Sequence, residues 1–262
     1  MISEPLDRIP LWLLFPLIFF GSLLMAEVGY RVGRWRHVRV KGEQEAPVAA
    51  ISASVLGLLA FMLAFAFGLA ASRFDDRRLA VLEEANALGT TYLRAHMLPD
   101  PFKTEIKQKL VRYTELRAME LTAENIGPAI QESLAIQSEI WTLAITVAQA
   151  DNSSITTGLF IQSLNESIDL HSKRVFVGLY SRVPVAIWGA LFFLFVLGVV
   201  SIGYHAGIVG TQRSLAMPIL ALAFAIVFYL IFDLDRSHEG LLQISQRAMI
   251  DLYTSMQTTT AK

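Results

Sequence analysis

Hydrophobic and polar positions alternate in long blocks along this chain. Four runs contain no Asp, Glu, Lys, Arg or His, at residues 9–26, 46–72, 183–204 and 214–232. A helix rises about 1.5 Å per residue, so about 17–25 apolar residues cross a hydrocarbon core roughly 30 Å thick. Lipid offers the backbone no hydrogen bonds, and each run is therefore predicted to be a transmembrane helix.

The second apolar run continues directly into the charged segment 73–78, RFDDRR. No proline or turn cluster separates the two, and apolar residues then recur every three to four positions as far as Tyr92. That spacing is typical of an amphipathic helix. We therefore expect one long helix over residues 46–94, half of it in lipid and half in water.

Residues 73–181 carry helical patterns separated by breaks at 99–101, 122–128 and 151–154. No run shows the alternation of a half-buried strand. The predicted fold is all-α, with four transmembrane helices and a helical extramembrane domain inserted between spans 2 and 3. The expected parts are residues 9–72 (spans 1 and 2), 73–181 (a domain continuous with spans 2 and 3), 183–232 (spans 3 and 4) and 233–262 (an amphipathic C-terminal segment).

Composition narrows the classes of function. The chain is 54% hydrophobic and 17% charged, with a net charge of −1, whereas soluble domains are about a quarter charged. Nucleic acid is therefore not an expected partner. There is no cysteine, and the five histidines lie in different segments without metal-ligand spacing. We predict no catalytic residue, metal or cofactor, and a multi-pass protein of the cell (inner) membrane that is not an enzyme.

Basic residues follow span 1 closely, with Trp35 among them: Arg31, Arg34, Arg36, Arg39 and Lys41. They indicate a headgroup anchor, and recognition of an anionic lipid is the alternative. By the positive-inside rule, the short loops would face the cytoplasm and the helical domain would lie outside. Three glycines, Gly203, Gly207 and Gly210, are interpreted as turn residues between spans 3 and 4.

Span 2 is the candidate pore helix. One of its faces carries small residues, Ala53, Gly57, Ala60, Ala64, Gly68 and Ala71, and another carries Leu58, Phe61, Phe65 and Leu69. These residues have two interpretations. They are ordinary packing or lipid-facing positions, or the large ones form an apolar constriction where several copies of span 2 surround a channel. In a channel, Ser52 and Ser54 would lie at one mouth and Asp75 and Asp76 at the other.

Charged residues cluster where span 2 leaves the lipid and where span 4 ends. They are Arg73, Asp75, Asp76, Arg77, Arg78, Glu83 and Glu84, together with Asp233, Asp235 and Arg236. By the count of spans, both clusters face the same side of the membrane. We expect either a solvated or intersubunit ion-pair network or a ring of charge at a pore mouth.

Several segments together resemble a known family. They are 73–78 (RFDDRR), 83–87 (EEANA), 89–90, 92–94, 164–166 with Asp169 and Arg174, 233–236 (DLDR), 239–240 and 245–246. This set is similar to the bestrophin-like (DUF4239) family of bacterial membrane proteins, itself distantly similar to bestrophin ion channels. In bestrophins the corresponding second-span segment carries a tryptophan pair, where this chain has Phe74 and Asp75. The chain also has no evident acidic calcium clasp.

The resemblance implies a pentameric channel for small inorganic ions. It further implies four spans per subunit, a helical domain inside the cell, and Phe61 and Phe65 in an apolar neck. The predicted function is an oligomeric ion channel with a pore lined by span 2. The alternative is a non-conducting membrane scaffold or sensor whose helical domain binds a partner.

Overall fold

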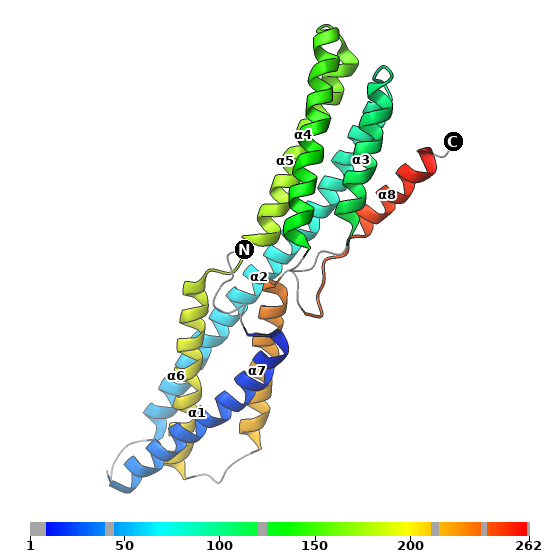
Figure 1. Cartoon of the computed structure of the whole chain (residues 1–262). Coiled ribbons are helices and arrows are strands. Elements are labelled where there is room, and N and C mark those ends of the chain that lie inside the picture. The colour runs from blue at the N-terminus through cyan, green and yellow to red at the C-terminus, as the bar shows by residue number, and fades with distance from the viewer. Residues whose placement is uncertain (1–8, 40–44, 120–124, 211–214, 237–239, 261–262) are drawn as a thin grey trace. The chain divides into compact units, whose positions relative to one another are not determined.

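The computed structural model describes residues 9–39, 45–119, 125–210, 215–236 and 240–260, and these residues contain helices but no strand (Figure 1). The prediction of an all-α fold is confirmed. The helices in chain order are α1 (Leu11–Arg39), α2 (Glu45–Ala95), α3 (Phe102–Ala118), α4 (Ile126–Ala150), α5 (Ile155–Leu179), α6 (Val185–Val209), α7 (Ala216–Asp235) and α8 (Arg247–Thr260).

The chain divides into two compact units. Unit 1 comprises Met1–Arg73 and Arg182–Leu242, which hold α1, the first part of α2, α6 and α7. Unit 2 comprises Phe74–Ser181 and Gln243–Lys262, which hold the rest of α2 with α3, α4, α5 and α8. The C-terminal helix therefore belongs to the same unit as the inserted helices.

Helix α2 runs without interruption from Glu45 to Ala95, so the expected single helix over 46–94 is confirmed. Its one proline, Pro47, lies in the first turn, where a missing backbone N–H costs nothing. Alanine and leucine, which favour helix, dominate the residues that follow.

The expected continuity between the helical domain and span 3 is wrong. Helix α5 ends at Leu179 and α6 begins at Val185, and the residues between them are not helical. Pro184 occupies the N-cap of α6. A proline disfavours helical backbone at the residue before it, and it has no N–H to donate to a preceding turn. The chain therefore starts a new helix at this point.

Within the described residues, α1, α2, α6 and α7 are the four helices long and apolar enough to cross a membrane. In unit 1, α6 and α7 pack through aromatic rings. The ring centroids of Trp188 and Phe232 lie 3.9 Å apart in a stacked pair, and those of Phe192 and Phe228 lie 5.4 Å apart. Stacked rings of this kind add to the stabilisation that comes from burial.

Glycines bring α1 and α6 into backbone contact. A methyl group on Gly29 or Gly33 would collide with backbone atoms of Val200 or Tyr204, and one on Gly203 would collide with Ala26. The interpretation of Gly203 and Gly207 as turn residues is therefore wrong, because both lie inside α6 and allow close helix packing. Of that group only Gly210 lies in a turn, at φ 71°, where it caps α6.

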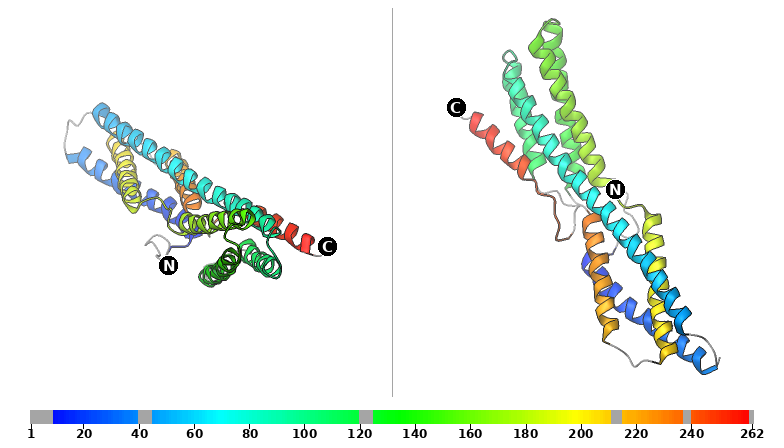
Figure 2. Two further views of the ribbon diagram at one scale, coloured as in Figure 1. Left: turned by 90° about the horizontal axis from the view of Figure 1, so that it is seen from above. Right: turned by 180° about the vertical axis from the view of Figure 1, so that it is seen from behind.

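Unit 2 is a helical bundle in which α3 packs on α4 and α8, and α4 packs on α5. Figures 1 and 2 show α4 and α5 side by side. The bundle core includes Leu88, Ile106, Ile140 and Phe160. Helix α8 contributes Met249 and Met256, neither of which is exposed. The amphipathic C-terminal segment is thus helical from Arg247 and packed.

Candidate functional site

The first candidate site is the side of α2 in unit 1 that carries the large apolar residues. Phe61 is 67% exposed, Phe65 53% and Leu58 51%, whereas Leu69 is half-buried. On the opposite side of the helix, Leu59, Leu63, Ala66 and Ala70 are buried against the rest of the unit. Three of the four predicted constriction residues therefore lie on a side of α2 that the described residues leave uncovered.

Small residues adjoin these rings on the same uncovered side. Gly57, Ala60, Ala64 and Gly68 are all exposed. A methyl group at Gly57 or Gly68 would meet no atom within 4 Å. The uncovered side of α2 is thus apolar. A row of small residues runs along it beside a row of larger side chains.

The two serines predicted at one pore mouth are separated by the packing. Ser52 is buried, and its Oγ lies 2.7 Å from Oγ of Ser201 on α6. Its predicted place at a pore mouth is therefore wrong. Ser54 is exposed, and its hydroxyl donates to the backbone carbonyl of Ala50 at 2.9 Å.

The charged residues after the apolar run do not share one environment. Asp75, Asp76 and Arg78 are exposed. Arg77 is buried, and its Nη1 donates to the carbonyl oxygen of Ser181 at 3.3 Å. Arg73, the last residue of unit 1 on this helix, is half-buried.

The two carboxylates at the end of α7 accept hydrogen bonds from the backbone of unit 1. Asp235 Oδ1 accepts a hydrogen bond from the backbone N–H of Val183 at 2.8 Å, and Asp233 Oδ1 accepts one from Leu241 at 3.0 Å. Gly240 has φ 109°, and a methyl group there would collide with the Asp233 carboxylate. Asp233, Asp235 and Arg236 are all buried.

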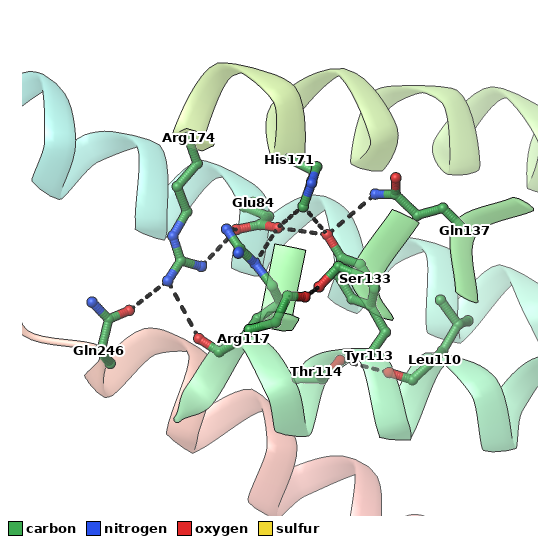
Figure 3. Close-up of polar contacts among 11 residues, drawn as sticks. Glu84, Leu110, Tyr113, Thr114, Arg117, Ser133, Gln137, His171, Arg174 and Gln246 are labelled. Atoms are coloured by element: carbon green, nitrogen blue, oxygen red, sulfur yellow. Dashed lines mark hydrogen bonds and ion pairs between the residues drawn. The ribbon is translucent and has the colours of Figure 1, made fainter. Parts of the chain in front are cut away.

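A second candidate site lies inside unit 2, around Glu84 (Figure 3). Glu84 comes from the part of α2 beyond the apolar run, and its side chain is fully buried. Arg117 of α3 donates through Nε and Nη2 to the two carboxylate oxygens at 3.0 and 3.2 Å. Arg174 of α5 donates through Nη1 at 2.6 Å. One carboxylate thus joins three helices.

Tyr113 extends this cluster towards α4 and α5. Its hydroxyl donates to Glu84 at 2.8 Å. Because that donation uses its only proton, the same oxygen accepts from Nδ1 of His171 at 2.8 Å and from Nε2 of Gln137 at 3.2 Å. On the other side, Arg174 Nη2 donates to Oε1 of Gln246, just before α8, at 2.7 Å.

The electrostatics of the cluster favour an ionised Glu84. Burial opposes ionisation, but the charges of Arg117 and Arg174 and the hydrogen bonds outweigh it and hold the pKa of Glu84 well below its usual range. Burial, followed by the charge of Glu84, raises the pKa of Tyr113 well above its usual value. The cluster therefore carries buried ion pairs at neutral pH.

Sequence reasoning placed Glu84 in a surface or pore-mouth network, together with Glu83. Glu83 does pair at the surface, with Nζ of Lys173 at 2.6 Å. Glu84 instead lies in the interior of the chain's own unit. Arg117, Tyr113, His171 and Gln137 were missed. The signal for Arg117 was its position four residues after Tyr113, on the otherwise apolar face of α3 formed by Ile106 and Leu110.

No group of three or more His, Cys, Asp or Glu side chains suited to a metal ion occurs in the described part of the chain. The uncovered side of α2 offers apolar side chains, and the Glu84 cluster offers a closed set of hydrogen bonds that connects helices.

Comparison with known proteins relates most of the chain to one family. The family model for the Bestrophin-like domain matches residues 19–249. A mutant bacterial bestrophin homolog from Klebsiella pneumoniae aligns with a TM-score of 0.68 at 17% identity, over 95% of this chain and 99% of that chain. Another structure of a bestrophin homolog from Klebsiella pneumoniae aligns with a TM-score of 0.67 at 16% identity, over 94% and 98%. Comparison with curated proteins finds no significant match.

Proposed function

Because the chain belongs to the Bestrophin-like family, we propose that it forms an oligomeric ion channel in the membrane. Several copies, five by resemblance to bestrophins, would surround an axis with α2 of each copy lining the pore. Small inorganic ions would be the permeating species. Family resemblance also favours a channel over an enzyme.

The observation that supports this proposal is the uncovered side of α2. In its most apolar stretch only 17% of residues are buried, against 28% to 39% in the other three candidate spans. Phe61 and Phe65, which are one helical turn apart, lie on this side together with small residues. A helix uncovered in one chain and lined by small residues allows close approach of neighbouring copies.

The proposed constriction is built from Leu58, Phe61, Phe65 and Leu69. A ring of apolar side chains offers a permeating ion no replacement for its water shell, so such a ring opposes conduction when it is narrow and dry. The exposed Asp75, Asp76 and Arg78 follow on the same helix and are proposed to lie at the pore mouth, where charges bias which ions enter.

The test is the current carried by purified protein in planar bilayers, for the wild type, Phe61→Ala and Phe65→Ala. Replacing either phenylalanine with alanine removes a phenyl group from every copy and widens the constriction. We therefore expect the open probability or the conductance to rise severalfold. Phe193→Ala on α6 is a matched control, because Phe193 is 65% exposed but lies outside the proposed pore helix. All variants should elute as the same oligomer.

Two results would contradict the proposal. One is the absence of current from a wild-type oligomer that is intact by size. The other is an equal response of Phe61→Ala and Phe193→Ala. Either result would leave a non-conducting scaffold or sensor as the better description of the assembly.

A further inference from the structure

The side of α1 that faces away from α6 forms a continuous apolar stripe. Its members recur every three or four residues and are between 48% and 67% exposed: Leu17, Phe20, Leu24, Val28 and Val32. That spacing places them on one face of the helix. The described residues of this chain do not cover the stripe, which leaves it available to the acyl chains of a lipid.

The same stripe ends in two arginines and a tryptophan. Arg31, Trp35 and Arg39 continue the three- and four-residue spacing, and all three are exposed. Arg31 lies 20 residues after Leu11, the first residue of α1, a separation of about 30 Å along a helix. That distance matches the hydrocarbon thickness, so Arg31 lies at the edge of the headgroup region. Trp35 and Arg39 follow about 6 and 12 Å further along the helix, and their long side chains reach back towards the headgroups, where tryptophan is enriched.

Arg39 and Trp35 form a cation–π pair. The guanidinium carbon of Arg39 lies 4.4 Å from the centroid of the Trp35 ring. A guanidinium that lies over a ring in this way keeps N–H donors at its edge for other partners. A phosphate binds to that edge through two parallel hydrogen bonds. Arg31 is partly neutralised by Glu27, whose Oε1 lies 2.9 Å from its Nε, so Arg39 carries the larger share of the charge.

The back of this segment is held rigidly. Gly29 and Gly33 face the opposite way and allow the backbone of α1 to contact Val200 and Tyr204 of α6. Close backbone packing leaves the end of α1 little freedom to rotate. The side of α1 that carries Arg31 and Trp35 is therefore directed away from α6.

From these observations we propose that Arg31, Trp35 and Arg39 form a binding site for the headgroup phosphate of an anionic phospholipid in the adjacent leaflet. The ligand chain lies along Val28, Leu24 and Phe20, and its phosphate accepts hydrogen bonds from Arg39. The charge balance favours an anionic lipid over a zwitterionic one. Among described residues 27–50, Arg31, Arg34, Arg36 and Arg39 outnumber Glu27 and Glu45.

The experiment uses the fluorescence of Trp35 in the full chain. A variant in which Trp12, Trp141 and Trp188 are replaced by Phe is reconstituted in phosphatidylcholine vesicles that contain phosphatidylglycerol or phosphatidylcholine brominated on the acyl carbons nearest the headgroup, the part of the chain closest to Trp35. Bromine quenches only a tryptophan that it contacts. We expect the preference for phosphatidylglycerol, measured as the ratio of Trp35 quenching by phosphatidylglycerol to quenching by phosphatidylcholine, to be about fivefold for each arginine that contributes. In the double variant Arg31→Gln with Arg39→Gln this ratio should fall towards one.

Trp12, which is 72% exposed near the other end of α1, provides the matched control as the only tryptophan of a second variant. Its quenching should show no preference for phosphatidylglycerol. Equal preference at Trp12 and Trp35, no preference at Trp35, or no quenching of Trp35 by either lipid would each overturn the proposal.

A second measurement covers the case in which the tryptophan variants fail to fold. Native mass spectrometry of the otherwise wild-type chain counts the phosphatidylglycerol molecules that it retains. Arg39→Gln with Arg31→Gln should lose at least one of them, whereas Arg247→Gln, an exposed arginine at the start of α8, should lose none. Equal retention by all three proteins would overturn the site.

Discussion

The carboxylate of Glu84 joins α2 to Arg117 on α3 and Arg174 on α5 inside unit 2. In Glu84→Gln these two buried guanidinium groups lose their counter-charge. Removing one partner of a buried ion pair costs about 3–5 kcal/mol of the free energy of unfolding. We therefore expect a large fall in the thermal midpoint at pH 7, measured by circular dichroism of the purified protein. Glu83→Gln is the adjacent control and should change it little, because its pair with Lys173 lies at the surface.

The ionisation of Glu84 also predicts that the stability of the protein falls at acidic pH. The pKa of Glu84 is depressed in the folded protein, so its contribution is fully present above the pKa of the unfolded chain, about 4.3 for glutamate. It is lost as the pH falls from there towards the lower folded pKa. The difference in thermal midpoint between wild type and Glu84→Gln should therefore shrink below about pH 4. A difference that stays constant down to pH 3 would contradict this account.

Among the helices, the contact of α1 with α6 depends on glycines, which have no side chain to separate the two backbones. We expect Gly203→Ala to lower the thermal midpoint by several degrees, because its methyl group would meet the backbone of Ala26. Gly189→Ala in the same helix is the control, since a methyl group there meets nothing within 4 Å. It should be neutral or slightly stabilising, because alanine favours helix. Equal effects of the two substitutions would show that the close contact does not matter for stability.

At the scale of the whole molecule, the side of the membrane that holds unit 2 can be tested directly. Resemblance to bestrophins predicts the cytoplasmic side, and the positive-inside count predicts the outer side. The chain has no cysteine, and Ser153 is exposed between α4 and α5, so Ser153→Cys gives one accessible thiol. We expect this thiol to resist a membrane-impermeant maleimide in intact cells and to react after permeabilisation. Labelling in intact cells would favour the outer side. Ser133 is unsuitable, because it is fully buried.

The amino-acid sequence alone determined which stretches are helical and which solvent each prefers. The four uncharged runs correspond to α1, α2, α6 and α7, and the unbroken pattern across residues 72–73 predicted the continuity of α2. Charge content and helical spacing are local properties, so they can be read without knowing what lies nearby. The bestrophin-like resemblance, carried by short segments such as 73–78, was confirmed by the family match.

Only the tertiary structure decided which face of each helix is covered. Helical spacing defines a face but not its partner, because the partner comes from a distant segment. Ser52 and Ser54 are two residues apart, yet one contacts α6 and the other is exposed. Glu83 and Glu84 are adjacent, yet one pairs at the surface and the other holds two buried arginines. The roles of these residues follow from contacts between segments that only the folded chain brings together.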